Sequence, residues 1–500
     1  MEILKRLFEY RHSDRLAMVN GNEEVTYHQL WDQSDLLAGY IKAYCGEDRT
    51  PIVVYGHKNP RMLVAFLACV KSGRAYVPVD ITVPRNRVES IIDAVHPRMI
   101  LTTEAFEPYQ DYAVLDVLRD DYRAGRQTPV TEDDYVDEDS VYYIIFTSGS
   151  TGEPKGVQIT YGALNHFTEW ALTLGGMPKE RKRFLNQAPF SFDLSVMDLY
   201  MSLASESCLV ALDKSVQLDY RALFQGLKQS GANVWVSTPS FADLCMADPG
   251  FNEDLLPELR LFLFCGETLT NHTAGNLLRR FPRARVYNTY GPTESTVAVT
   301  EVQVTEEVLQ RYNPLPVGQA KPGTTIKIMD GQQELAEGER GEIVIIGNTV
   351  SAGYFKRPEE TDKAFFTYNM NGVPTPAYRT GDKGYLKGGQ LFYCGRMDLQ
   401  IKLHGYRMEI EDVEKNLMKV PGIDKAVVVP VYEGGKVKYL KAYCIYEGDV
   451  VSQLAAQKQI KSQMAAFVPD YMIPRKIRLV DEIPMTANGK ADRRRIQEID

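Results

Sequence analysis

The sequence predicts an α/β fold, with a large N-terminal domain of layered α/β subdomains, a β-rich subdomain and a small mobile α+β C-terminal domain. Apolar strand-like runs alternate with helical patterns over most of the chain, which is typical of parallel sheets covered by helices. Residues 315–395 are punctuated by Gly and Pro, which is typical of a β-rich region. The pattern then restarts, so we expect domains over residues 1–396 and 397–500.

The predicted elements follow this order along the chain. The alternation of strand and helix begins with a strand over 51–55, a helix over about 60–72 and a strand over 75–79. Earlier in the chain, Thr26 to Gln29 form a capping box that begins a helix. Further strands are predicted over 141–146, 233–237, 261–264, 285–287 and 342–346. In the C-terminal domain, we expect helices over 409–418 and 453–467 and strands over 426–431 and 439–446.

Composition excludes several classes of protein. The chain has 500 residues, 57 Lys and Arg against 66 Asp and Glu, and a net charge of −9, which argues against binding to nucleic acid or anionic membranes. The longest apolar run, 62–70, is far below the roughly 18 residues of a membrane span. The N-terminus lacks the apolar core of a secretory signal, so we expect a cytoplasmic protein without membrane insertion.

Cysteine and histidine usage argues against disulfides and zinc. The seven cysteines are scattered and include no C-x-x-C, and the seven histidines form no cluster with them at metal-ligand spacing. Mg²⁺ held by carboxylates and phosphates is the better-supported metal.

The most informative segment runs from Tyr143 to Gly156, where an apolar strand enters a loop with four hydroxyl residues, three glycines and Lys155. Glycines let backbone N–H groups approach a polyphosphate, hydroxyls donate hydrogen bonds and the lysine adds positive charge. A surface turn is the alternative. The chain has no G-x-x-x-x-G-K-[ST] and no G-x-G, which argues against P-loop and Rossmann phosphate sites.

This loop resembles the signature of the adenylate-forming superfamily, which includes acyl-CoA synthetases, luciferases and amino-acid adenylation domains. The resemblance implies the fold of these enzymes and ATP as a substrate. It also implies that Thr147, Ser148 and Lys155 bind the phosphates. Four segments further along the chain agree with it, in the family's order and spacing.

The first of these segments is N-T-Y-G-P-T-E over 288–294. The resemblance implies that Tyr290 stacks on adenine, that Thr293 contacts the α-phosphate and that Glu294 binds Mg²⁺. An aromatic face suits a purine, and a carboxylate is a hard oxygen ligand. A capped turn is the alternative. The ATP-binding residues implied here are Asn288, Thr289, Tyr290, Gly291, Pro292 and Thr293.

Two more segments resemble the ribose motif and the interdomain hinge. In Y-R-T-G-D over 378–382, Asp382 would accept hydrogen bonds from both ribose hydroxyls. In the segments 395–402 and 405–409, Asp398 would be the hinge and Arg396 would reach the nucleotide. The resemblance also implies ATP binding by Tyr393, Cys394, Gly395 and Arg396.

The last segment, P-M-T-A-N-G-K over 484–490, resembles the loop that carries the family's catalytic lysine. Alone, a lysine this near a chain end is normally solvated surface. The resemblance implies that Lys490 is catalytic and contacts both ATP and the acid substrate. At about 4 Å and an effective dielectric near 20, one such charge contact is worth roughly 4 kcal/mol.

The segment from Gln187 to Asp198 indicates the substrate. Amino-acid adenylation domains carry an aspartate in this F-D context that pairs with the substrate's α-ammonium, so Asp193 implies an amino acid. Its alternative role is the N-cap of a helix that begins at Leu194. Leu194, Met197, Cys265 and Val297 would fill the pocket from its walls and leave room for a small side chain.

Longer strings narrow the resemblance further. The chain resembles the ligases that adenylate D-alanine and load it on the phosphopantetheine of a D-alanyl carrier protein, for D-alanylation of teichoic acids, in the strings Y-I-I-x-T-S-G-S-T-G-x-P-K-G-V-Q-I-T-Y, L-N-Q-A-P-F-S-F-D-L-S-V-M-D and F-L-F-C-G-E. This resemblance implies D-alanine binding by Asp193, Cys265, Val297 and Lys490. Phe146 and Glu153 depart from the related enzymes, but neither has an assigned role.

Partner and rival functions follow from the same segments. The chain has no carrier-domain serine motif, so we expect the carrier in trans. Residues 397–500 hold 17 basic and 15 acidic residues, a charge of +2 that suits an acidic carrier. The alternatives are an adenylation enzyme for another small amino acid and a non-catalytic nucleotide-binding protein of the same fold. An acyl-CoA synthetase is disfavoured by Asp193.

Overall fold

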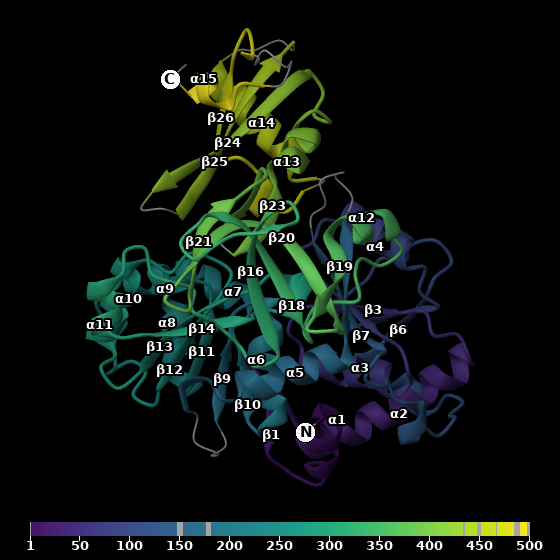
Figure 1. The fold of residues 1–500 in the computed structure, drawn as a ribbon. Helices are drawn as coiled ribbons and strands as arrows, with labels where there is room; N and C mark the ends of the chain where they lie inside the picture. The colour runs from purple at the N-terminus through teal and green to yellow at the C-terminus, as the bar shows by residue number, and fades with distance from the viewer. Residues whose placement is uncertain are drawn as a thin grey trace. The chain divides into compact units, whose positions relative to one another are not determined.

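The computed structural model describes residues 2–147, 154–176, 182–403, 405–433, 436–447, 452–466, 468–484 and 491–497. The chain divides into two compact units (Figure 1). The first is drawn from residues 1–81, 94–146 and 156–395, and the second from 82–93, 147–155 and 396–500. Among the described residues, no helix combines the length and the apolar character that crossing a membrane requires.

The largest sheet of the first unit has a mostly parallel centre with antiparallel strands at both edges. In spatial order its strands are β15 (Gln319–Ala320), β14 (Thr300–Val304), β13 (Arg285–Tyr290), β12 (Leu261–Phe264), β11 (Val234–Ser237), β9 (Arg183–Asn186), β10 (Cys208–Ala211), β1 (Leu16–Asn20) and β2 (Glu23–Thr26). The central strands are buried apolar runs, as both faces of a parallel sheet are covered.

A second sheet in the same unit has parallel pairs through β6, β5, β3, β4 and β7. Its order is β6 (Ala113–Asp116), β5 (Met99–Thr102), β3 (Ile52–Gly56), β4 (Tyr76–Asp80), β7 (Val141–Thr147) and β8 (Lys155–Thr160). The third sheet is antiparallel, in the order β17 (Gln333–Glu334), β16 (Thr324–Asp330), β18 (Gly341–Gly347), β20 (Val373–Lys387) and β19 (Phe365–Met370), with β21 (Gln390–Arg396) paired to β20.

Helices cover the first two sheets, and one hydrophobic core joins them. The helices of this unit are α1 (Ile3–Glu9), α2 (Tyr27–Cys45), α3 (Pro60–Lys71), α5 (Tyr161–Ala171), α6 (Leu194–Ala204), α7 (Lys214–Leu218), α8 (Tyr220–Ser230), α9 (Pro239–Met246), α10 (Asn271–Arg280) and α11 (Glu306–Arg311), with α12 (Pro358–Ala364) in contact with β19 and β20 of the third sheet. Every residue of α6 is buried, and its side chains share a core with residues of α3, α5, β4, β9 and β12.

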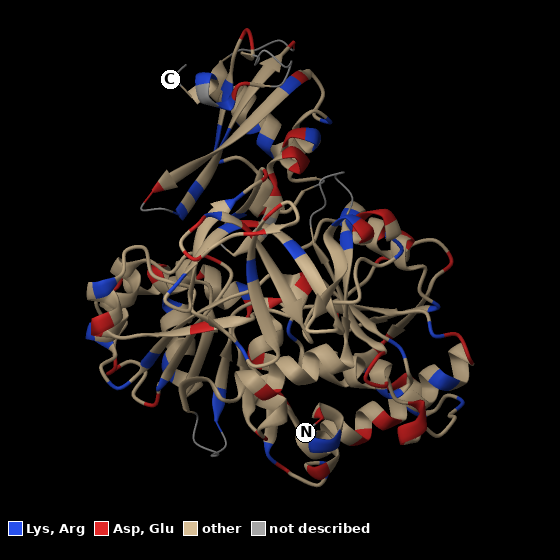
Figure 2. Ribbon diagram, in the orientation of Figure 1, with Lys and Arg blue, Asp and Glu red and all other residues tan. Residues whose placement is uncertain are grey.

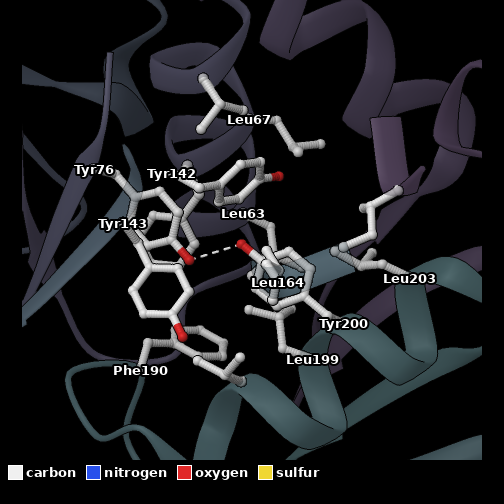
Figure 3. Packing of buried hydrophobic residues seen from close by; sticks show 14 of the residues in the cluster. Leu63, Leu67, Tyr76, Tyr142, Tyr143, Leu164, Phe190, Leu199, Tyr200 and Leu203 are labelled. Atoms are coloured by element: carbon white, nitrogen blue, oxygen red, sulfur yellow. Dashed lines mark hydrogen bonds between the residues drawn. The ribbon is translucent and has the colours of Figure 1, made fainter. Parts of the chain in front are cut away.

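Aromatic side chains fill the centre of this core (Figure 3). The hydroxyl groups of Tyr76 and Tyr200 are 2.7 Å apart, and the Tyr76 ring stacks on Phe66 with centroids 4.2 Å apart. The hydrogen bond satisfies two phenols that would otherwise be buried without a polar partner. Charged residues lie on helices, loops and antiparallel strands such as β20, whereas the central strands β11 and β12 of the largest sheet carry none (Figure 2).

The described part of the second unit contains a hairpin, a small sheet and three C-terminal helices, together with residues 85–93 of α4 (Arg85–Val95). The hairpin joins β22 (Gln400–Leu403) and β23 (Tyr406–Glu409), and the sheet has the order β24 (Ile423–Glu433), β25 (Lys436–Tyr446) and β26 (Lys476–Leu479). Its C-terminal helices are α13 (Ile410–Leu417), α14 (Gln453–Met464) and α15 (Arg493–Gln497). Buried apolar side chains of α13, α14 and β24 to β26 form its core.

The predicted fold class and most predicted elements are confirmed. The capping box at Thr26 is present, with the Thr26 hydroxyl accepting from the Gln29 amide and the Gln29 side chain accepting from the Thr26 amide. In α3, Asn59 caps the N-terminus and Pro60 occupies the first turn, where the missing N–H costs nothing. Four predictions missed a boundary by three residues, since β13 runs on to Tyr290, α14 already ends at Met464, and β24 and β25 begin at Ile423 and Lys436.

Three lysines of the first unit are buried. Burial lowers the pKa of Lys58, Lys71 and Lys321 to about 8 in each case. The ammonium of Lys71 donates to Asp35 Oδ1 at 2.7 Å, to Ser34 Oγ at 2.8 Å and to the Trp31 carbonyl at 3.3 Å. These acceptors offset much of the cost of removing the charge from water.

Lys71 makes the stability of the protein depend on pH. Between about pH 8 and the ordinary lysine pKa near 10.4, the unfolded chain holds a proton that the folded protein has released. Stability conferred at this position therefore rises with pH in that window, by about 3 kcal/mol. The melting temperature of the wild type relative to Lys71→Met should increase from pH 7.5 to pH 10. A constant or shrinking difference would contradict this assignment.

Candidate functional site

The loop between β13 and β14 carries most of the nucleotide motif. Tyr290 ends β13, and the short helix η5 (Thr293–Ser295) follows it. The Val299 amide donates to the Tyr290 carbonyl at 2.8 Å, which closes the loop, and the Ser351 amide donates to the Glu294 carbonyl at 2.8 Å. The two ends of the loop are therefore bonded to each other, and its middle is fixed to the main chain at Ser351.

This loop contains a strained turn. Thr296 and Val297 have φ values of 60° and 65°, which are unfavourable for β-branched residues. The Ala298 amide donates to the Thr296 carbonyl at 2.8 Å, and the Thr296 hydroxyl donates to the Thr349 carbonyl at 2.9 Å. A Cβ atom on Gly291 would lie 2.6 Å from Ala298 Cα, so only glycine allows this approach. Backbone strain of this kind gathers at functional sites.

Glu294 is a fully buried carboxylate held by a tyrosine. The Tyr354 hydroxyl donates to Glu294 Oε1 at 2.8 Å, and Glu294 has 0% exposure. Tyr354 is fixed by a bridge to Val157 of β8 and by an edge-on contact with Phe365. The orientation of the predicted magnesium ligand is thus set by a residue that sequence reasoning missed.

Tyr290, Asp382 and Tyr393 come together from three strands. The Tyr290 hydroxyl donates to Asp382 Oδ2 at 2.6 Å, and the Tyr290 and Tyr393 rings are 5.9 Å apart. Burial, followed by the negative charge of Asp382 and the hydrogen bond to it, raises the pKa of Tyr290 well above its usual value. The Asp382 amide donates to the Thr380 hydroxyl at 2.9 Å, which fixes the turn. The predicted adenine and ribose residues are therefore neighbours.

Asp193 lies at the start of α6 but does not cap it. Its φ and ψ are −55° and −32°, which are helical, and its side chain makes no capping hydrogen bond. The capping alternative is therefore wrong. Asp193 is 8% exposed. Burial and then the Asp193 charge raise the pKa of Tyr143 well above its usual value, so the carboxylate lies close to this phenol of β7.

The predicted substrate side-chain residues share one core. Cys265 Sγ is 3.5 Å from the Val297 carbonyl oxygen, and both residues are buried. Leu194 and Met197 belong to the same hydrophobic cluster. The strained turn places Val297 against Cys265, which follows β12. The loop between β13 and β14 therefore carries both the predicted nucleotide residues and one of the predicted side-chain residues.

Predicted residues of the second unit make two separate contacts, Thr147 with Lys155 and Arg396 with Asp398. The Thr147 hydroxyl, at the end of β7, is 3.5 Å from the Lys155 carbonyl at the start of β8. Arg396 donates to both Asp398 oxygens, at 2.8 and 2.5 Å. Ser148 and Lys490 lie outside the described residues, as does the departure at Glu153.

Other predicted ATP residues have side chains committed to the main chain. The Asn288 amide donates to the Pro316 carbonyl at 2.8 Å, and the Thr289 hydroxyl donates to the Phe264 carbonyl at 2.9 Å. These bonds fix the end of β13 against β12 and the loop before β15. Cys394 is exposed, and Gly395 has φ 99° with open space around its Cα.

The residues present fit a magnesium ion that is shared with a nucleotide. Within the described ranges, no group of three His, Cys, Asp or Glu side chains gathers to hold a metal. Mg²⁺ usually takes only one or two protein carboxylates where it also binds phosphates. The buried Glu294, oriented by Tyr354, supplies a carboxylate of this kind.

The fold and the site define a nucleotide-dependent enzyme with a large α/β unit and a small α+β unit. The family model described as "AMP-binding enzyme" matches residues 7–355, and that described as "AMP-binding enzyme C-terminal domain" matches residues 412–490. The chain belongs to the AMP-binding enzyme family.

Its curated relatives narrow the class. The chain is 47% identical to D-alanine–D-alanyl carrier protein ligase of Bacillus licheniformis over 504 aligned residues, which cover 100% of this chain and 99% of the relative. It is 45% identical to the ligase of the same name from Bacillus thuringiensis, with 97% and 96% of the two chains covered.

Solved structures show the same fold. A nonribosomal peptide synthetase protein with adenylation and PCP domains, bound to a vinylsulfonamide inhibitor, has a TM-score of 0.84 and 28% identity, covering 100% of this chain and 84% of that one. The Vibrio cholerae adenylation domain AlmE, in complex with glycyl-adenosine-5′-phosphate, has a TM-score of 0.82 and 23% identity, covering 100% and 97%.

Gly291→Ala tests whether the strained turn is needed by the site. The new methyl group would press on main-chain atoms of Val297 and Ala298, which cannot rotate away. We expect ATP affinity, measured by titration calorimetry, to fall by about tenfold or more, with a loss of roughly 1–3 kcal/mol in stability. Gly226→Ala, in α8 with ordinary contact distances, is the control and should leave ATP affinity unchanged. Equal affinities for the two variants would contradict the role of the turn.

Proposed function

We propose that this chain activates D-alanine with ATP and then transfers it to a carrier protein. The D-alanine carboxylate attacks the α-phosphorus of ATP, an O–P bond forms, and the bond to pyrophosphate breaks. The phosphopantetheine thiol of a D-alanyl carrier protein, supplied in trans, then loses its proton and attacks the acyl carbon, which releases AMP. The 47% identity over the full chain to a ligase of this name carries the proposal.

The first half-reaction needs charge neutralisation, because two anions meet at the α-phosphorus. We assign Lys490 to this role, with Thr147, Ser148, Lys155 and Thr293 donating to the phosphates. A Mg²⁺ ion on Glu294 and the phosphates would neutralise part of the same charge. Tyr290 and Asp382 would hold adenine and ribose, together with the main chain of Asn288 to Pro292 and of Tyr393 to Arg396.

The amino acid would be selected by one charge and a small apolar space. The Asp193 carboxylate suits an α-ammonium group and disfavours fatty acids, which lack the positive charge. Cys265 and Val297 are in contact and would limit the side chain to about one methyl group. The reaction would take place in the cytoplasm and supply D-alanine for teichoic acid.

The second half-reaction needs a different arrangement of the two domains. We propose that the domain of residues 397–500 rotates about Asp398 after adenylation and withdraws Lys490. The Arg396–Asp398 ion pair is exposed on its Asp398 side, so it adds little stability and opposes such a rotation weakly.

The decisive experiment is amino-acid-dependent ATP–pyrophosphate exchange. A panel of D-alanine, L-alanine, glycine, D-serine and a fatty acid should give the highest kcat/KM with D-alanine. Preference for another amino acid would keep the chemistry and change the substrate. ATP binding without exchange for any acid would contradict catalysis and favour a nucleotide-binding protein.

Lys490→Ala separates the two half-reactions. If Lys490 supplies about 4 kcal/mol to adenylation alone, exchange should fall by roughly a thousandfold. Thioester formation on the carrier from supplied D-alanyl adenylate, followed by mass spectrometry, should stay within a few-fold of wild type. Equal losses in both steps would refute this division of roles.

A further inference from the structure

Lys58 is a buried lysine that the reaction does not use. It follows β3 with φ 50°, and its side chain is 1% exposed. Its ammonium donates to the carbonyls of Gln187 at 2.7 Å, Leu212 at 2.8 Å and Asn186 at 3.3 Å. An ammonium has three N–H donors, and here each donates to a main-chain carbonyl. These carbonyls lie at the ends of β9 and β10 in the largest sheet, whereas Lys58 follows β3 of the second sheet.

These carbonyls mark the start of the segment that carries Asp193. Asn186 ends β9 and Leu212 follows β10, so Lys58 clamps the carboxyl ends of two neighbouring strands. Residues 187–193 then lead directly to Asp193 at the start of α6. The position of Asp193 therefore depends on where this segment begins.

The segment is also braced from α6. Asn186 Nδ2 donates to both oxygens of Asp198, at 3.1 and 3.2 Å, and to the Ala188 carbonyl at 3.1 Å. Asp198 lies on α6 five residues after Asp193, and it is fully buried. The start of the segment 187–193 is thus held by Lys58 and, through Asn186, by Asp198 of α6.

We propose that Lys58 is a positioning residue for the amino-acid substrate: by clamping the main chain at Asn186, Gln187 and Leu212, it holds the segment that presents Asp193. This inference rests on the proposed function. A methionine at position 58 would remove one hydrogen-bond donor from each of the three carbonyls and so make the position of the segment 187–193 less fixed. Tyr290 and Asp382 lie on β13 and β20, which the Lys58 ammonium does not contact, so nucleotide binding is spared.

A matched pair of buried lysines tests the proposal. Lys58 and Lys71 are both fully buried and both donate to three acceptors, but the acceptors of Lys71 lie on α2. In the exchange assay at pH 7, Lys58→Met should raise the KM for D-alanine by about tenfold and leave the KM for ATP and the kcat within about twofold. Lys71→Met should lower the melting temperature comparably and change neither KM.

A second variant, Gln217→Ala, tests the same proposal if the Lys58→Met protein does not fold. The half-buried Gln217 donates from Nε2 to the Leu212 carbonyl at 2.8 Å and to the Gln187 carbonyl at 3.1 Å. Gln217→Ala should raise the KM for D-alanine by about twofold to threefold, because it removes a second donor from the same carbonyls. Its KM for ATP should not change.

The outcomes separate this proposal from the proposed function. If wild type shows no exchange with any amino acid, the proposed function fails and the role of Lys58 fails with it. If wild type is active, unchanged KM values for D-alanine in both Lys58→Met and Gln217→Ala overturn the Lys58 proposal alone. So does an equal rise in both KM values, which would indicate general damage.

Discussion

The close approach of Gly291 to the turn at Thr296 and Val297 is the constraint on which the rest of the site depends. Each left-handed β-branched residue costs on the order of 1–3 kcal/mol. Hydrogen bonds to Thr349, Ser351 and Tyr290 offset part of this cost. Since the loop spans fewer than ten residues, fixing its turn also fixes Tyr290, Glu294 and Val297. One strained main-chain conformation thus sets the positions of the residues that we propose for the nucleotide, the metal and the substrate side chain.

Buried charge is the second organising feature. Glu294, Asp382 and Asp193 are all nearly inaccessible, and tyrosines accompany them: Tyr354 and Tyr290 by hydrogen bonds, and Tyr143 by proximity. A phenol stabilises a carboxylate without neutralising it and is itself largely apolar. The carboxylates therefore keep their capacity to bind a cation or a diol, which a lysine or arginine partner would reduce by supplying an opposing charge.

The sequence was sufficient for the fold class, the capping box at Thr26 and the grouping of Tyr290 with Asp382, since local patterns and motif strings carry that information. It did not reveal Tyr354 or Lys58, whose partners lie 60 and at least 128 residues away. A lysine after a strand and a tyrosine after a glycine have no local signature of burial. For Asp193, the sequence left capping open, and the helical dihedral angles at that residue and the missing side-chain capping hydrogen bond excluded it.

The two halves of the candidate site differ in how freely they can change. Val297 has a left-handed backbone conformation, and its main chain lies close to Gly291. A different residue at position 297 must therefore adopt the same backbone conformation before its side chain can change the shape of a pocket. Cys265 follows the regular strand β12, is absent from the residues with a left-handed backbone, and contacts the turn through its sulfur. The segment 187–193 is irregular and is held from outside by Lys58 and Asp198. A change of amino-acid specificity should therefore arise at Cys265 or along this segment, where side chains can be exchanged without disturbing the loop that we propose binds the nucleotide.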